Sequence, residues 1–561
     1  MKTFWTKKYP PQVSDQINPD QYQNILEVFD EAVRKFRYKK AFTNFGCSLT
    51  FNEVDVLSGQ FASYLQNTLK LKQGDRIAIQ LPNVLQFPIV LFGALRAGLI
   101  IVNTNPLYTA PEMKHQFNDS GAKAIVILAQ FAHLLESILP ETKLEHVLVT
   151  QVGDQLPFIK KTLINFVLKT VKKMVPDYNL KHHTWSEALS FGSSGSYQQF
   201  KLDHSSIAFL QYTGGTTGVS KGAVLTHKNI ISNMLQICEW MKPKLVEGEE
   251  ISVAPLPLYH IFSLTVCCLA FVRYGAENIL VTNPRDIPAF IKLLKSTRFT
   301  ILTGVNTLYN ALAHHPDIKS VDFSNLKISV AGAMALQQAV KDIWKKSTGT
   351  DVIEGYGLTE ASPVVCCNPI DGTDRVGTIG LPLPSTEIKL VNDDNKDVTD
   401  TGESGELCVR GPQVMQGYYN RPDETAKVMK DGWLLTGDIA QMDKDGFVKI
   451  VDRKKDMILV SGFNVYPNEV EDVLAKNPKV LEVAAIGVPD VHSGEIVKVF
   501  IVKKDDSLTE QEVIAWAKQS LTNYKVPKQV EFIKDLPKTN VGKVLRRALR
   551  TPPPTDQTAS K

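Results

Sequence analysis

The chain is poor in cysteine, with seven among 561 residues. Two pairs are adjacent, Cys267–Cys268 and Cys366–Cys367, and no two cysteines have the CxxC spacing. This pattern excludes a disulfide framework and a cysteine-based zinc site. We expect a reducing compartment, with the cysteines as small core residues rather than nucleophiles.

Long apolar runs are also absent. The most apolar stretch, residues 87–102, contains Arg96 and two glycines, and it is shorter than the roughly 20 residues that a membrane-spanning helix needs. It is more typical of a helix that returns to a buried strand. The first residues, 1–11, are polar and basic and no apolar core follows them, so we expect no signal peptide and a cytoplasmic protein.

Neither sign of charge is in large excess, since the formal net charge is +4. No basic face interleaved with aromatic residues occurs, which argues against nucleic acid as a partner. The chain has 43% hydrophobic and 22% charged residues, a balance that supports full hydrophobic cores. Its length predicts about three to four domains.

The chain does contain a glycine-rich segment at residues 212–222, just after the apolar run Ile207–Leu210. A strand, a tight turn and a second strand fit this pattern. Glycines let the backbone point successive N–H groups inward, which suits a phosphate chain. The segment consists of Tyr212, Thr213, Gly214, Gly215, Thr216, Thr217, Gly218, Val219, Ser220, Lys221 and Gly222.

This segment departs from the Walker pattern, in which Gly, Lys and then Ser or Thr open a helix. Here Ser220 precedes Lys221 and Gly222 follows it, which argues against a P-loop NTPase. A glycine-rich hairpin without a ligand is the alternative for this segment taken alone. Motifs further along the chain favour the phosphate site.

Five more motifs follow in order: Leu256–His260, Glu354–Glu360, Gly432–Asp438, Asp452–Asp456 and Pro537–Lys543. Together with residues 212–222 they resemble the signatures of the adenylate-forming, or acyl-activating, enzyme superfamily. Within it the chain is similar to the bacterial long-chain fatty acid–CoA ligases, a likeness that includes Ile458–Tyr466.

The resemblance implies a reaction in two steps. ATP would convert a fatty acid to acyl-AMP with release of pyrophosphate, and CoA would then take the acyl group. ATP and CoA would be cosubstrates and Mg²⁺ the cofactor. The product would serve β-oxidation, lipid synthesis or both. Relatives are often homodimers, although the sequence does not determine the oligomeric state.

The resemblance also assigns roles to single residues. Lys543 would bridge the substrate carboxylate and the α-phosphate, and His260 would line the acyl tunnel. The phosphates and Mg²⁺ would be held by residues 213–218, Lys221, Thr359 and Glu360, with Thr217 and Glu360 on the metal. The nucleoside would be bound by Gly332, Ala333, Gly355, Tyr356, Asp438 and Arg453, with the ring of Tyr356 on adenine and Asp438 on the ribose hydroxyls.

Related branches differ at identifiable positions. Acetate-specific enzymes have a bulky Trp where this chain has Gly357, so we expect glycine here to leave room for a long acyl chain. Amino-acid-adenylating modules have an acid near the start of the segment equivalent to residues 256–264, and none is present. A luciferase-like oxygenase and a catalytically silent fatty-acid carrier remain alternatives. Light emission with oxygen would reveal the oxygenase, and release of pyrophosphate would exclude the silent carrier.

The expected fold class is α/β. Residues 1–452 would form a large AMP-binding domain of parallel α/β subdomains, with a β-rich subdomain at about 377–451. Residues 453–550 would form a small, mobile α+β cap domain, and residues 551–561 a flexible tail. By resemblance, the cap rotates about Lys455 between the two half-reactions, and the Ser461–Gly462 segment then lines the thiol channel.

One further segment, Phe158–Val175, has the pattern of a basic amphipathic helix. It contains five lysines and no acid, with apolar residues at helical spacing. Such a helix can lie on an anionic membrane surface. The alternative is a surface helix that packs its apolar side on its own domain. On the first interpretation the protein would be peripheral at the cytoplasmic face of the membrane.

Overall fold

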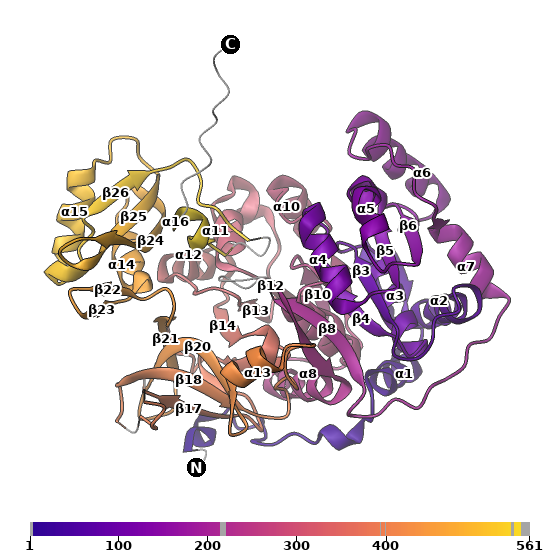
Figure 1. Ribbon diagram of the computed structural model, residues 1–561, viewed down its shortest axis with the longest axis horizontal. Helices are drawn as coiled ribbons and strands as arrows, with labels where there is room; N and C mark the ends of the chain where they lie inside the picture. The colour runs from indigo at the N-terminus through magenta and orange to yellow at the C-terminus, as the bar shows by residue number, and fades with distance from the viewer. Residues whose placement is uncertain (1–3, 214–219, 393, 399, 540–542, 551–561) are drawn as a thin grey trace.

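The computed structural model describes residues 4–213, 220–392, 394–398, 400–539 and 543–550. Two large α/β units lie side by side, an antiparallel β unit lies below them in the view of Figure 1, and a small α+β unit lies at the carboxyl end. The expected α/β class with a small C-terminal unit is confirmed. The predicted tail, residues 551–561, falls outside the described residues.

The first α/β unit is built on a seven-stranded sheet, ordered β7-β6-β5-β3-β4-β8-β9, in which only the β8–β9 pair is antiparallel. The two strands predicted on either side of the glycine-rich turn are present as β8 and β9, and both are longer than the apolar runs that indicated them. The strands are β3 Arg76–Gln80, β4 Ile100–Asn103, β5 Ala124–Leu128, β6 His146–Thr150, β7 His183–Thr184, β8 Ile207–Thr213 and β9 Lys221–Thr226.

Helices connect these strands in the manner of parallel crossovers. The residues of α3 (Gln86–Arg96) are buried except for Arg96, so the apolar stretch at residues 87–102 is a core helix followed by a strand, as predicted. The other helices of this half are α1 Ile25–Phe36, α2 Phe51–Ser63, α4 Ala110–Ser120, α5 Ala132–Ile138, α6 Phe158–Phe166 and α7 Trp185–Ser193.

The second α/β unit has a nine-stranded sheet with the order β16-β15-β14-β13-β12-β10-β11-β1-β2. Its central strands are parallel, and antiparallel pairs close both ends. The strands are β1 Lys40–Asn44, β2 Cys47–Thr50, β10 Ile251–Ala254, β11 Glu277–Leu280, β12 Ile301–Gly304, β13 Ile328–Ala331, β14 Val352–Gly357, β15 Val364–Cys367 and β16 Leu381–Pro382.

The helix α8 (His227–Met241) belongs to the core that both α/β units share. Thirteen of its residues are buried, because it packs against the π-helical segment η7 (Ser263–Ala270) and other elements on several sides. The remaining helices of this unit are α9 Phe271–Arg273, α10 Ile287–Lys295, α11 Asn306–His314 and α12 Gln338–Thr348.

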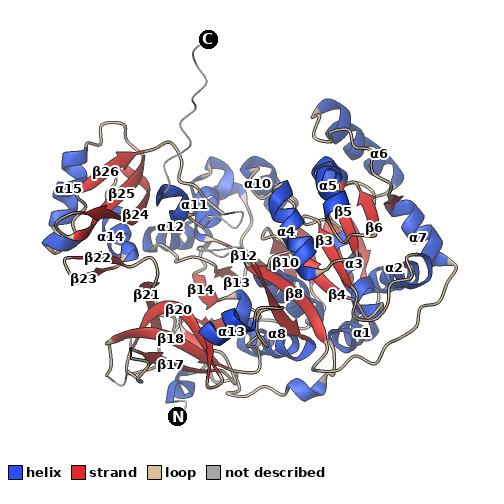
Figure 2. Ribbon diagram, in the orientation of Figure 1, coloured by secondary structure: helices blue, strands red, loops and turns tan. Residues whose placement is uncertain are grey.

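A five-stranded antiparallel sheet forms the β-rich unit, as the short strands and turns of this region predict. It consists of β17 Glu387–Val391, β18 Ser404–Arg410, β19 Met429–Lys430, β20 Trp433–Met442 and β21 Val448–Arg453, with α13 Pro422–Val428 beside it (Figure 2). The first two residues of the charged motif Asp452–Asp456 are the last residues of β21 and pair with β20.

The cap has a sheet and a hydrophobic core of its own. A capping box between Thr509 and Glu512 begins α15. The elements are β22 Ile458–Val460, β23 Phe463–Val465, α14 Pro467–Leu474, β24 Val480–Asp490, β25 Gly494–Lys503, α15 Glu510–Lys518, β26 Gln529–Phe532 and α16 Arg546–Arg550.

Candidate active site

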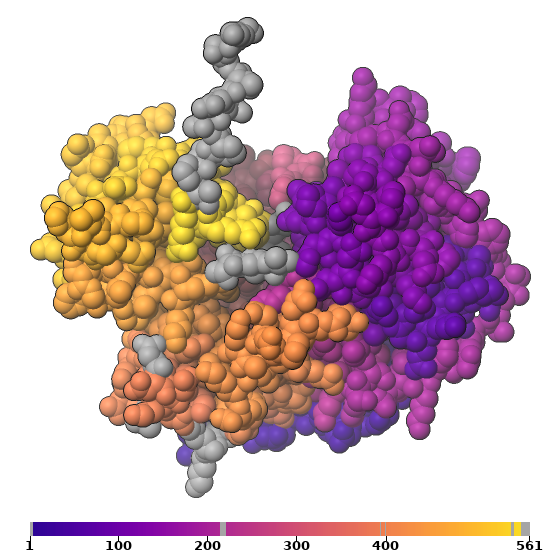
Figure 3. All heavy atoms as spheres, in the orientation of Figure 1, coloured from indigo at the N-terminus to yellow at the C-terminus, as the bar shows by residue number. Residues whose placement is uncertain are grey.

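A cavity of 1210 Å³ lies where all four units meet. Its walls come from the ends of β8, β13 and β14, from the β-rich sheet and from the cap residues Lys538, Thr539, Lys543, Val544, Leu545 and Arg547. Ligands of open α/β sheets bind at the carboxyl ends of the parallel strands. In this protein the carboxyl ends of β13 and β14 lie at the cavity. In the space-filling view the cap and the N-terminal unit stand on opposite sides of a cleft (Figure 3).

The structure brings most of the predicted site residues to this one cavity. Lining it are Tyr212, Thr213, Lys221, His260, Gly332, Ala333, Gly355, Tyr356, Gly357, Thr359, Glu360, Asp438, Arg453, Lys455 and Lys543. Residues 214–219, which include the predicted metal ligand Thr217, lie outside the described residues. Ser220, Gly222 and Gly462 are described but are not among the lining residues.

The glycine-rich segment leaves β8 and returns as β9, with Thr213 paired to Lys221. The Lys221 ammonium lies 2.6 Å from a Glu424 carboxylate oxygen and 4.8 Å from the centre of the Tyr418 ring. Hydrogen bonds from Lys221 and Lys427 lower the pKa of Glu424 to about 2, so this acid is ionised at neutral pH. An ionised carboxylate therefore lies on one side of the Lys221 ammonium.

Thr359 and Glu360 follow the end of β14 in a short 3-10 turn. The Tyr418 hydroxyl donates to Glu360 at 2.6 Å, which fixes the carboxylate at the cavity wall. Mg²⁺ in nucleotide sites is usually held by one or two carboxylates together with phosphate oxygens and water. Among the described residues no cluster of three or more His, Cys, Asp or Glu could hold a metal by itself, and a single carboxylate beside a phosphate site fits a metal that arrives with ATP.

Gly357 needs a different explanation from the one the sequence suggested. A Cβ at this position would lie 2.2 Å from the Pro363 carbonyl oxygen and 3.0 Å from the Val364 Cα. The space that a side chain of residue 357 would occupy is therefore taken by the backbone at the start of the neighbouring strand β15, and is not open to an acyl chain. The expectation that this glycine leaves room for a long chain is corrected: close approach of two strands requires it.

Three polar residues form a linked group on the side of the cavity that we expect to bind the nucleoside. The Tyr356 hydroxyl donates to one oxygen of Asp438 at 2.5 Å, and Arg453 Nε lies 3.2 Å from the other. Burial, reinforced by the Asp438 charge, raises the pKa of Tyr356 well above its usual value, so the hydroxyl keeps its proton. Each carboxylate oxygen can accept a second hydrogen bond, which leaves Asp438 able to bind a diol.

His260 faces a different, apolar part of the cavity. Loss of solvent lowers the pKa of this imidazole to about 4, so it is neutral at physiological pH. Its Nδ1 accepts a hydrogen bond from the Phe262 amide at 3.3 Å. The apolar lining nearby comes from α8 and from the segment that enters η7: Ile237, Trp240, Met241, Ile261, Phe262 and Val266.

Lys543 lines the cavity from the cap, close to Asp438 and Arg453. Burial and repulsion from Arg453 lower its pKa to about 8, with attraction by Asp438 acting in the opposite direction. Gly462, the other predicted cap residue, lies in the turn between β22 and β23 with φ +83°, and a Cβ added to it would meet no atom within 4 Å. It therefore borders open space that another molecule could enter.

Sequence reasoning did not identify several polar groups of this cavity. Tyr418 contacts Glu360, and Glu424 contacts Lys221. His115 contacts the Ser220 carbonyl at 2.9 Å. Neither Tyr418 nor Glu424 belongs to the six recognised motifs, and their distance from these motifs in the chain hides the contact. The repeated aromatic and acidic residues of 417–424 are the only signal in the sequence.

Comparison with known proteins now adds to this geometry. The model of the AMP-binding enzyme family matches residues 29–419, more than half of the chain, and that of the AMP-binding enzyme C-terminal domain matches residues 469–543. The chain belongs to the AMP-binding enzyme family. Several curated proteins resemble it over nearly their whole length.

A long-chain-fatty-acid–CoA ligase of Escherichia coli O157:H7 is 54% identical over 551 residues, covering 98% of each chain. One of Bacillus subtilis is 38% identical, covering 97% of each chain. Among solved structures, an anthranilate CoA ligase in complex with anthranoyl-AMP has a TM-score of 0.84 at 25% identity, covering 95% of this chain and 98% of the other. The fold and family expected from the motifs are confirmed.

Proposed function

We propose that this protein is an AMP-forming long-chain fatty acid–CoA ligase. It activates a free fatty acid with ATP to acyl-AMP and pyrophosphate, then transfers the acyl group to CoA. The observation that carries the proposal is the 54% identity to a ligase of that name over 98% of the chain. The cavity supports this proposal, because one part of it has charged residues that suit a nucleotide and another part, beside His260, is apolar.

In the first half-reaction, a carboxylate oxygen of the fatty acid attacks the α-phosphorus of ATP and pyrophosphate leaves. Two anions must approach each other, so most of the catalysis is electrostatic positioning. Lys543 binds the carboxylate and the α-phosphate, Lys221 and the glycine-rich segment bind the outer phosphates, and Thr359 lies at the α-phosphate. Glu360, with Thr217, would hold Mg²⁺, which neutralises charge that builds up on the phosphoryl oxygens.

In the second half-reaction, the thiol of CoA attacks the acyl carbonyl, a thioester forms and AMP leaves. The nucleophile comes from the cosubstrate, so no cysteine of the chain is required. Six of the seven cysteines are buried, and burial raises the thiol pKa of each of these six. Such thiols are inert.

The same cavity must serve both steps. We propose that the cap, residues 453–550, rotates about Lys455 after adenylation. Lys543 then withdraws, and the Ser461–Gly462 turn lines the path of the thiol. The homodimer expected from relatives stays a prediction.

Activity with a ladder of fatty acids tests the proposed substrate class. With ATP and CoA in excess, the specificity constant should rise with chain length, because each buried methylene contributes about 0.8 kcal/mol until the channel ends. Pyrophosphate release and acyl-CoA formation are measured together. A better specificity constant for acetate than for palmitate would refute the proposal, and pyrophosphate release without acyl-CoA would point to another acyl acceptor.

We also propose peripheral contact with anionic membranes through α6 and the π-helical segment η6 (Val167–Val171). The helix packs on its domain through Ile164 and Leu168, yet Phe158 is 82% exposed and Ile159 79%. The further exposed apolar side chains are Leu163, Phe166, Val171 and Met174. An exposed apolar face of this size beside lysines favours a lipid surface.

The position of α6 supports this contact. It lies at the outer edge of the N-terminal unit, away from the cap (Figure 1). Lys160 donates to the carbonyl of Phe45, a residue that is itself 46% exposed, so the β1–β2 turn extends the same apolar surface. No described helix has the length and apolarity to cross a membrane.

A further inference from the structure

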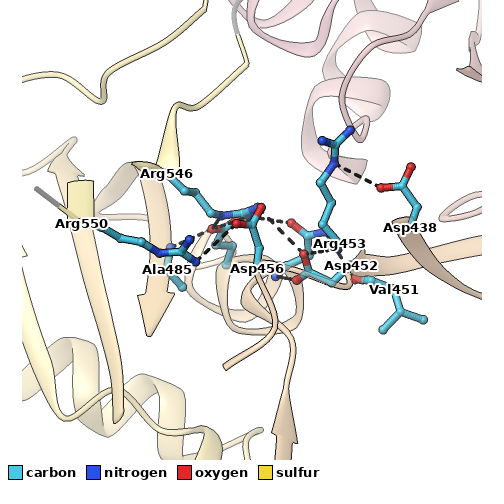
Figure 4. A network of polar contacts seen from close by, with 10 residues as sticks. Asp438, Val451, Asp452, Arg453, Asp456, Ala485, Arg546 and Arg550 are labelled. Carbon is cyan, nitrogen blue, oxygen red and sulfur yellow. Dashed lines mark hydrogen bonds and ion pairs between the residues drawn. The ribbon is translucent and has the colours of Figure 1, made fainter. Parts of the chain in front are cut away.

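Arg546 is the centre of a polar network at the junction of the cap and the β-rich sheet (Figure 4). It begins α16, shortly after Lys543 in the chain. Its guanidinium Nη2 donates to both carboxylate oxygens of Glu471 at 2.8 Å and to Asn468 Oδ1 at 2.8 Å. Both partners belong to α14, so these bonds lie within the cap.

The same guanidinium also faces acids on both sides of Lys455. Its Nη1 lies 3.9 Å from Asp452 and 3.6 Å from Asp456. Asp452 is the last residue but one of β21, a strand of the β-rich sheet, whereas Asp456 precedes the first strand of the cap. Arg546 therefore connects the segment that carries Lys543 to the two residues that flank the proposed pivot.

Asp452 joins the two units by a second route. Its side chain is completely buried. One of its oxygens accepts from the Arg453 amide at 2.7 Å and the other from the Asn468 amide at 2.8 Å, at the start of α14. A buried carboxylate of the β-rich sheet thus binds the amino end of a cap helix and lies beside a cap arginine.

The network also bears on the position of Lys543. Repulsion from Arg453, Arg546 and Lys455 acts on this ammonium, so the acids of the network must offset a concentration of positive charge. The Lys543 segment is closed on itself by a hydrogen bond from the Thr539 amide to the Lys543 carbonyl at 2.7 Å. Arg546 fixes the carboxyl end of this segment to the pivot.

We propose that Arg546 and Asp452 form a latch that holds the cap in the adenylating arrangement, with Lys543 directed into the cavity. Both are positioning residues that act through Lys543. A rotation about Lys455 moves α14 and α16 together, relative to β21, so it breaks the contacts of Asp452 and preserves those of Glu471. This inference rests on the proposed rotation of the cap.

Asp452→Asn is the most informative variant. The amide oxygen can still accept a hydrogen bond and the volume is unchanged, but the negative charge is lost. Arg546→Lys is the second variant, because lysine keeps the charge and loses the planar fork that binds Glu471. The matched control is Lys525→Met, which removes a cation bound to Glu469 of the same helix at 2.7 Å and 2.8 Å within the cap.

The readout is the single-turnover rate of each half-reaction, with thermal unfolding to show that every variant is folded. We expect Asp452→Asn and Arg546→Lys to form acyl-AMP about tenfold more slowly, the effect of a latch weakened by roughly 1.4 kcal/mol. Conversion of supplied acyl-AMP to acyl-CoA should be unchanged or faster. Lys525→Met should leave the ratio of the two rates unchanged.

Two outcomes would overturn the latch. One is an equal loss of both half-reactions in Asp452→Asn and Arg546→Lys, and the other is no change in either. A Lys455→Pro variant run in parallel separates this result from the fate of the rotating cap. If Lys455→Pro divides the half-reactions and the latch variants do not, the latch alone is wrong; if none of the three divides them, the rotation itself is wrong.

Discussion

At the scale of single residues, Lys543 has the clearest consequence for pH dependence. The role in adenylation that we propose for Lys543 needs its charged form, and burial lowers its pKa to about 8, from an ordinary value near 10.5. Because a depressed lysine pKa removes the charge as pH rises, kcat/KM for ATP should fall above about pH 8. The rate of acyl-AMP formation, measured between pH 6 and about 10, checks this.

The Lys543→Ala variant gives the matching control. It should form acyl-AMP at least a hundredfold more slowly, roughly the effect of removing one group that stabilises transition-state charge, and it should lose the decline of rate above about pH 8. It should still convert supplied acyl-AMP to acyl-CoA. A wild-type rate that stays constant to about pH 10 would show that the lysine titrates elsewhere.

Gly357 leads to a prediction about stability. A Cβ there would overlap the Pro363 carbonyl at 2.2 Å, so even Gly357→Ala should require a shift of β15 and cost about 1–3 kcal/mol of folding free energy. Gly355→Ala is the control on the same strand, since its Cβ would meet no atom closer than 3.7 Å. Equal unfolding temperatures for both variants would contradict the strand contact.

The same residue shows where sequence reasoning ends. The motifs identified Tyr356, Glu360 and Asp438 because each lies in a short recurring pattern, and all three line one cavity. The motifs could not reveal that the Pro363 carbonyl leaves no space for a side chain at position 357, or that Glu424 pairs with Lys221. Such contacts join residues far apart in the chain or depend on the separation of two strands, which no local pattern records.

At the scale of elements, local signals in the sequence are strongest where a helix has a side-chain cap or a strand has a buried apolar run. Asn24 caps α1 by accepting from two amides, and Thr509 begins α15. The segment η7, in contrast, is apolar on every side, so periodicity gave no sign of its π-helical form. Likewise, β1 and β2 join a sheet whose other strands begin some 200 residues later, through the parallel pairing of β1 with β11.

Residues 158–175, which include α6 and η6, form the element with a testable role outside the active site. It combines an exposed apolar face with five lysines, and each lysine near an anionic surface contributes about 1 kcal/mol. We expect the protein to float with vesicles that contain anionic lipid and to dissociate as salt rises. Changing all five lysines, 160, 161, 169, 172 and 173, to Glu should abolish flotation and leave acyl-CoA synthesis in detergent unchanged.

The control for this test has the same change of net charge elsewhere. It changes five exposed lysines outside the segment to Glu: Lys244, Lys319, Lys346, Lys396 and Lys518. We expect this variant to float like the wild type. Flotation that is equal for both charge-reversed variants would remove α6 as the contact. A Phe158→Ser, Ile159→Ser double variant should weaken binding even at low salt, because the apolar contribution is not screened.

At the scale of the whole molecule, one cavity is assembled from four units, and among the described residues the cap contributes none to the main hydrophobic core. The principal cap core lies within residues 458–526, whereas the β-rich sheet shares residues such as Leu407 and Leu434 with the main core. The proposed rotation of the cap would therefore break few apolar contacts. It would bend the chain at the connection, near Lys455.

Lys455→Pro tests this bending. A rotation needs a residue that changes φ and ψ by a large amount, whereas proline fixes φ near −65°. If proline holds the adenylating arrangement, the variant should form acyl-AMP at a normal rate and convert it to acyl-CoA at least about tenfold more slowly. Lys455→Ala keeps the freedom of the backbone and should carry out both half-reactions. Because Lys543→Ala has the opposite deficiency, a mixture of the two variants should restore acyl-CoA synthesis if acyl-AMP passes through solution. Equal loss of both half-reactions in Lys455→Pro would mean that one arrangement of the cap serves both steps.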